Sequence, residues 1–71
     1  MEAFVVNVMY WATPAVEASR AVTVNAVDVD SAITTALRGF PSEVNALAVN
    51  VIDVDGYEVW DISSDHENGP R

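Results

Sequence analysis

The sequence predicts an α+β domain in which one helix packs on one face of a four-stranded antiparallel sheet. Three observations carry this prediction. Four short apolar runs are typical of strands, one segment between them has helical spacing, and two octapeptides nearly repeat. The octapeptides are VNAVDVDS at residues 24–31 and VNVIDVDG at residues 49–56. Because a helical pattern follows the first and a hairpin signal follows the second, the repeat marks two equivalent strand ends.

The first strand is expected over residues 3–11, where both faces are apolar. A strand of this kind is covered on both sides or lines an interface, so it belongs in the middle of the sheet. Thr13 and Pro14 begin a loop that extends to about residue 19, and a second strand follows over residues 20–27. These two strands are expected to form an antiparallel hairpin.

The helix is expected to begin at Asp30 or Ser31, since either side chain can accept a hydrogen bond from the free amides of the first turn. Gly39 is expected in the left-handed conformation after the last turn, and Pro41 prevents the helix from continuing. Apolar residues recur along one helical face across this segment and its flanks, at Val29, Ile33, Ala36, Leu37 and Phe40.

The remaining chain is expected to form a second hairpin. The third strand covers residues 46–54, Asp55 and Gly56 form a tight turn, and the fourth strand covers residues 57–62. Residues 63–71 are polar and aperiodic, which predicts a flexible tail after a single domain at 1–62. Docking the third strand beside the first gives the strand order 2-1-3-4, with the most apolar strand in the middle. Pairing of the third strand with the second stays open at this point.

Alternation assigns the strand side chains to two faces of the sheet, one that the helix covers and one that no other segment is expected to cover. The helix side is expected to hold Phe4, Val6, Val8, Val22, Val24, Leu47, Val49 and Val51. The uncovered side is expected to hold Val5, Asn7, Met9, Trp11, Thr23, Asn25, Val27, Ala48, Asn50 and Ile52. This second set is too apolar for a solvated sheet and too polar for a core, which favours a binding surface. The other interpretation is that a bulge shifts one strand and that the small sheet tolerates exposed valines.

The charge is strongly acidic. Eleven carboxylates face three arginines and no lysine, which gives a formal net charge of −8. Nucleic acid and anionic membranes are therefore not expected to bind, because little on the chain neutralises phosphate. A protein with a basic surface is the natural complement, and solubility alone is the other explanation. Four of the carboxylates lie close together in the sequence, at Asp53, Asp55, Glu58 and Asp61.

The residues that commonly carry chemistry do not form a site. A calcium loop of the EF-hand type counted from Asp53 would place Tyr57 at a ligand position and Ser64 where glutamate is required, so no metal site is expected. His66, the single histidine, lies in the predicted tail and has no positioned partner for acid–base catalysis. The chain has no cysteine and no glycine-rich phosphate loop. We expect neither an enzyme nor a cofactor.

Residues 22–33 (VTVNAVDVDSAI), the third strand at 46–54 and the segment GYEVW at 56–60 together resemble small proteins of phages and mobile elements. The pattern of element order and apolar spacing over residues 3–62 resembles a type I-F anti-CRISPR family, and DpnD/PcfM-like domains are similar at the strand-to-helix junction. The resemblance implies binding to a CRISPR surveillance complex and blocking of target DNA. The anti-CRISPR protein that the chain resembles uses basic and polar contacts, whereas this chain has no lysine. No functional residue is therefore carried over from it.

The sequence therefore favours a non-enzymatic inhibitor of phage type in the bacterial cytoplasm, whose carboxylates take the place of phosphates in a basic nucleic-acid channel. The residues expected to bind this partner are Asp53, Asp55, Glu58, Asp61, Asn7, Met9, Trp11, Asn25 and Asn50. The alternative is a homodimeric assembly module that uses the uncovered sheet face. A cytoplasmic location is also expected from the absence of an apolar leader and of a run long enough to cross a bilayer.

Overall fold

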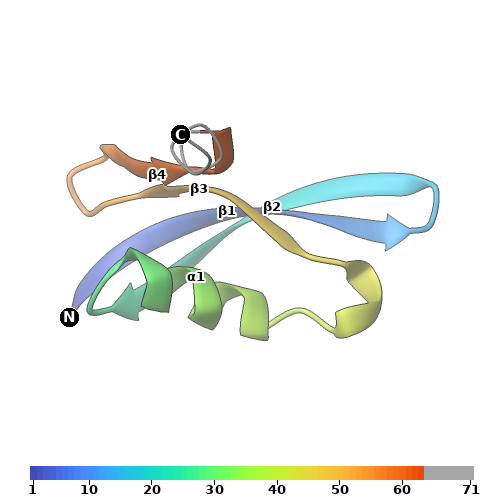
Figure 1. Cartoon of the computed structure of the whole chain (residues 1–71), viewed down its shortest axis with the longest axis horizontal. Coiled ribbons are helices and arrows are strands. Elements are labelled where there is room, and N and C mark those ends of the chain that lie inside the picture. The colour runs from blue at the N-terminus through green and yellow to red at the C-terminus, as the bar shows by residue number, and fades with distance from the viewer. Residues whose placement is uncertain (64–71) are drawn as a thin grey trace, which may run out of the picture.

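The computed structural model describes residues 1–63 and confirms the predicted fold class. Its sheet has the order β2-β1-β3-β4, every neighbouring pair is antiparallel, and one helix lies on one side of it (Figure 1). The elements in chain order are β1 (Glu2–Thr13), β2 (Val16–Ala26), α1 (Val29–Arg38), a 3₁₀ turn η1 (Ser42–Val44), β3 (Leu47–Ile52) and β4 (Glu58–Asp61). Residues 64–71, most of the predicted tail, lie outside the described residues.

The first hairpin is longer and its turn tighter than the sequence indicated. Only Pro14 and Ala15 lie between β1 and β2, whereas a loop reaching residue 19 was expected. The strands stay paired from Glu2 opposite Ala26 to Trp11 opposite Glu17, with an irregularity before Thr13. The Thr13 hydroxyl accepts a hydrogen bond from the Ala15 amide at 3.3 Å, which helps close the turn. The start of β2 was missed because it is exposed and carries few apolar side chains.

The helix begins two residues earlier than expected. Asp28 is its N-cap, and the Asp28 Oδ1 atom accepts a hydrogen bond from the Ser31 amide at 2.8 Å, so the prediction of Asp30 or Ser31 as the cap is wrong. Gly39 is the C-cap, but its φ of −78° is right-handed rather than left-handed. The left-handed residue is Asn45, with φ 51°, which follows the 3₁₀ turn.

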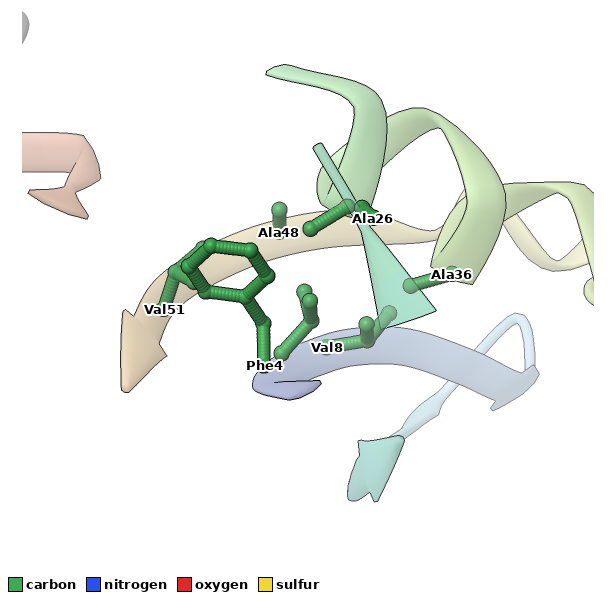
Figure 2. Packing of buried hydrophobic residues seen from close by; sticks show 8 residues of the cluster. Phe4, Val8, Ala26, Ala36, Ala48 and Val51 are labelled. Atoms are coloured by element: carbon green, nitrogen blue, oxygen red, sulfur yellow. The ribbon is translucent and has the colours of Figure 1, made fainter. Parts of the chain in front are cut away.

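The core lies between α1 and the sheet and is built from small side chains. Ala32 and Ala36 of the helix are almost completely buried, and they meet the buried strand residues Phe4, Val6, Val8, Ala26, Ala48 and Val51 (Figure 2). Ala32 was not part of the predicted helical face. Since alanine projects only a methyl group, these two positions let the helix approach the strands closely. The expected face residues Val29, Ile33, Leu37 and Phe40 pack around this contact and are partly buried.

A bulge in β3 changes which residues reach the core. Asn7 lies opposite Asn50 and Val8 lies opposite Ala48, so Val49 has no partner in β1. Ala48 is consequently buried against the helix, at 4% exposed, while Leu47 is 42% exposed. The prediction that Leu47 and Val49 face the helix and that Ala48 faces away is therefore wrong, because the extra residue reverses the alternation.

The second hairpin is shorter than predicted. β3 ends at Ile52 and β4 begins at Glu58, so the connection has five residues, Asp53 to Tyr57, instead of a two-residue turn. Gly56 has φ 89°, a left-handed conformation that glycine adopts without steric cost. Trp60 lies opposite Val51 and packs against the core, which anchors the short outer strand.

The helix cap makes stability depend on pH. The hydrogen bonds from Ser31 lower the pKa of Asp28 below its ordinary value of 3.8. This contribution to the free energy of unfolding is present in full above that ordinary value and is lost as the pH falls through the lower folded-state pKa. We expect Asp28→Ala to lower the urea midpoint at pH 7. Asp28→Asn, which keeps an acceptor but does not titrate, should lose less stability than the parent protein between pH 5 and pH 2 in urea titrations followed by circular dichroism. Equal acid losses in the two proteins would contradict the assignment of the cap.

The bulge in β3 leads to a second prediction, which compares substitutions at the adjacent residues Ala48 and Val49. Ala48→Asp places an unpaired charge in the core and should cost more than about 3 kcal/mol of unfolding free energy. Val49→Asp makes the same change in charge at a half-buried position and should cost less than about 2 kcal/mol. Circular dichroism during urea unfolding measures both. If Val49→Asp were the more damaging variant, β3 would follow the unbroken alternation instead.

Candidate functional site

The side of the sheet opposite α1 is the candidate site. We call it the open face, because α1 contacts β1, β2 and β3 from the other side, and the 3₁₀ turn η1 contacts β1 near Trp11, at the end of the hairpin. Register and alternation place the following residues on it: Val5, Asn7, Met9, Trp11, Glu17, Ser19, Ala21, Thr23, Asn25, Leu47, Val49, Asn50, Ile52, Glu58 and Asp61. Its middle part, around Asn7 and Asn50, is half-buried by neighbouring side chains, and shallow hollows beside Met9 and Val49 interrupt it.

A chain of three polar side chains crosses the open face from β1 to β4. The Asn7 Nδ2 atom donates to Asn50 Oδ1 at 2.6 Å, and Asn50 Nδ2 donates to a Glu58 carboxylate oxygen at 2.9 Å. Asn7 and Asn50 lie directly opposite each other in the register, so the contact follows from the strand pairing itself. We call these three residues the polar chain.

The direction of the polar chain is fixed by its last member. An ionised carboxylate only accepts hydrogen bonds, so Asn50 turns its NH₂ group toward Glu58 and its carbonyl oxygen toward Asn7. Asn7 then contributes its own NH₂ group and retains Oδ1 as an acceptor. Among the described residues nothing donates to that oxygen. Both ends of the chain are therefore acceptors, and the matching ligand is a group rich in donors.

The loop between β3 and β4 continues the acidic character beyond the polar chain. Asp53 organises it, since its Oδ1 atom accepts hydrogen bonds from the amides of Asp55 at 2.9 Å and Tyr57 at 3.0 Å. Its backbone also bonds Tyr57 and Gly56, at 2.8 Å and 3.0 Å. The first aspartate of each Asp-Val-Asp run thus organises the chain after a strand, since Asp28 caps α1 and Asp53 closes the loop after β3. The exposed side chains of the loop are then Asp55 and its neighbours Val54 and Tyr57.

The structure brings together only some of the residues expected at the site. Asn25 is on the same face as Asn7, but it lies opposite Ala3 at the outer edge and takes no part in the polar chain. Trp11 lies far along the hairpin, opposite Glu17, where it lines a shallow hollow with Pro14 and Val44. Met9 lies next to the centre, opposite Ser19 and Leu47, and Asp61 lies opposite Asn50 in β4.

Two members of the open face, Leu47 and Val49, were expected on the side that the helix covers. Both were assigned to the core, because a bulge leaves no mark in the alternation of an apolar strand. A usable signal was the pair Ala46 and Ala48, whose small side chains suit positions beneath a close helix better than leucine and valine do. With Leu47 and Val49 added, the apolar surface around Met9 is larger than predicted.

Other kinds of site receive no support within the described part of the chain. No group of three or more His, Cys, Asp or Glu side chains in residues 1–63 is placed to hold a metal ion. None of the helices described there has the length and hydropathy needed to cross a membrane.

Comparison with known proteins finds no matching family model, no matching curated protein and no matching solved structure. The resemblance to type I-F anti-CRISPR proteins therefore stays a prediction.

The polar chain leads to the prediction that one variant becomes more stable as the pH falls. Asn50→Asp replaces the donor facing Glu58 with a second carboxylate. The two carboxylates repel each other, so the pKa of one of the pair rises. At pH 7 the variant should lose about 1–2 kcal/mol of unfolding free energy, and it should recover part of this as the pH falls toward 4 and a proton is shared. The control is Asn50→Asp/Glu58→Gln, which restores a donor opposite the new carboxylate and leaves Asp61 as its remaining acidic neighbour, so it should recover less stability than the single variant in that range. Urea titrations provide the test, and a single variant that behaves as its control does would disprove the contact.

Proposed function

We propose that this protein is a non-enzymatic inhibitor of phage type that binds a basic nucleic-acid-binding surface of a host defence complex and blocks access of DNA. The observation that carries the proposal is the polar chain, which ends in acceptors at Asn7 and Glu58 and lies beside the acidic loop. Arginine and lysine are the side chains that offer several donors and positive charge at once. They are also the side chains with which proteins hold nucleic-acid phosphates.

The surroundings of the polar chain favour a protein partner over a small ligand. Val5, Met9 and Ile52 flank it with half-buried apolar surface, and the hollows of the open face are shallow. A flat surface with an apolar part and a polar line across it is typical of protein interfaces. Once water is excluded, hydrogen bonds from a guanidinium to Glu58 and to Asn7 Oδ1 are stronger than they are in water.

The distribution of charge gives the binding a direction. Asp55 and Glu58 belong to the β3–β4 hairpin, and Asp61 follows in β4. The two described arginines lie elsewhere, Arg20 on β2 and Arg38 at the end of α1. A basic channel would therefore attract the β4 edge first and orient the protein during encounter.

The candidate partner is a type I-F CRISPR surveillance complex, chosen on the resemblance of residues 3–62 to inhibitors of that class. The experiment measures binding of the purified protein to this complex and release of its target DNA, by sedimentation and gel shift. We expect a stable complex in about 50 mM salt that weakens at least tenfold in about 500 mM salt, because screening shortens the range of charge attraction.

Matched variants locate the contact. Asp55→Asn/Glu58→Gln removes two charges at the β4 edge while keeping an acceptor for Asn50, and it should weaken binding about tenfold. Asp30→Asn/Glu43→Gln removes the same charge on α1 and η1 and should leave binding within about twofold. Absence of binding at low salt would refute this choice of partner. Binding that ignores both salt and the first pair of substitutions would refute the electrostatic mechanism.

A further inference from the structure

The outer edge of β2 is an unused pairing surface. Among residues 1–63, β2 pairs only with β1, so one side of its backbone has no strand beside it over eleven residues. Proteins commonly block such edges with lysine, proline, bulges or very short strands. β2 contains no lysine or proline, and its register with β1 is unbroken from Ala26 to Glu17. The charges of its two ionisable side chains, Glu17 and Arg20, cancel, so the edge has no net charge.

We propose that two copies of this chain associate by antiparallel pairing of β2 with β2, which joins two four-stranded sheets into one continuous sheet. A two-fold axis through such a pair stands perpendicular to the sheet, so residues opposite each other belong to the same face. Both helices then lie on one side and both open faces on the other. The occupant of the edge is thus a second copy of this chain, and the reason lies in the sequence of β2.

One register pairs every residue of the strand with a residue of the second copy. In it Val16 lies opposite Ala26 and Ala21 lies opposite Ala21 at the two-fold axis. A methyl group is the least demanding side chain at this position, since each side chain there faces the same residue of the second copy. Moving the axis by one residue to Arg20 would bring two guanidinium groups face to face and shorten the overlap.

The other pairs in this register are complementary as well. On the open face Glu17 lies opposite Asn25 of the second copy, a carboxylate facing an amide donor, and Ser19 lies opposite Thr23, two hydroxyl side chains. On the helix side Arg20 lies opposite Val22 and Ala18 opposite Val24. Val22 and Val24 are only partly buried in one copy, so these contacts would cover more of their surface. No pair opposes two like charges.

The other edge of the sheet is built differently. β4 has four residues, two of them Glu58 and Asp61, and the loop before it carries Asp53 and Asp55. Pairing β4 with itself would bring at least four carboxylates together, which charge repulsion disfavours. Association through β2 instead keeps the acidic edges at the two ends of the joined sheet, about as far apart as the assembly allows. This proposal is independent of the proposed function, since it concerns the protein alone.

Sedimentation equilibrium of the purified protein tests the pairing. We expect a monomer–dimer equilibrium with a dissociation constant between about 1 μM and 1 mM, the range for a small interface. Ala21→Glu places two carboxylates against each other at the axis and should raise the dissociation constant at least tenfold. Val54→Glu adds the same charge to the exposed β3–β4 loop and should change it less than twofold. Circular dichroism establishes that both variants are folded.

A charge swap tests the register. Ser19→Lys/Thr23→Glu creates two opposite-charge pairs across the axis and should tighten the dimer about tenfold, whereas Ser19→Glu/Thr23→Glu creates two repulsive pairs and should weaken it. A protein that sediments as a monomer up to about 1 mM overturns the proposal. So does a dimer that withstands Ala21→Glu but dissociates in Met9→Lys, which would place the contact on the open face. Equal affinities for the two double variants would overturn the register.

Discussion

The rest of this structure depends on the close approach of α1 to the sheet through Ala32 and Ala36. Both methyl groups are buried against valines of β1 and β3, so the core is thin and made of small side chains. Within residues 1–63 one α-helix lies on the sheet, and that helix satisfies one face only. The apolar residues on the other face are therefore a consequence of the size of the domain as well as a candidate for binding.

The bulge at Val49 belongs to the same constraint. An unbroken β3 would place Leu47 and Val49 beneath α1, where their larger side chains would push the helix away from Ala32 and Ala36. The extra residue puts Ala48 there instead and turns Leu47 outward. The same bulge adds apolar surface to the open face, so close packing on one side of the sheet increases the exposed apolar area on the other.

Much of the fold was predictable because it follows from local rules and from sums of apolar contacts. The central position of β1 followed from apolar residues on both its faces, and α1 from one helical stripe with Pro41 after it. What the sequence concealed depends on tertiary contacts. Which aspartate of an Asp-Val-Asp run caps the helix depends on where the chain leaves β2, and the length of the first hairpin depends on backbone pairing along exposed residues.

The candidate site was predictable in part, because the shared face of Asn7 and Asn50 was visible from alternation. The third member of the polar chain, Glu58, came into reach only through the five-residue loop that Asp53 organises.

The polar chain is better explained by recognition than by stability. Replacing its three members with apolar side chains of similar size would leave no buried polar group unpaired and would enlarge the apolar contact between β1, β3 and β4. Hydrogen bonds at a half-exposed surface contribute little to folding, since water replaces them readily. Their distinctive effect is geometric, because Asn50 holds the exposed Glu58 carboxylate beside itself on the open face. A carboxylate fixed in position loses little conformational freedom when a guanidinium binds it, which lowers the entropic cost of binding at that one place. This is the physical reason why the proposed partner should make its contact where Asn7, Asn50 and Glu58 meet.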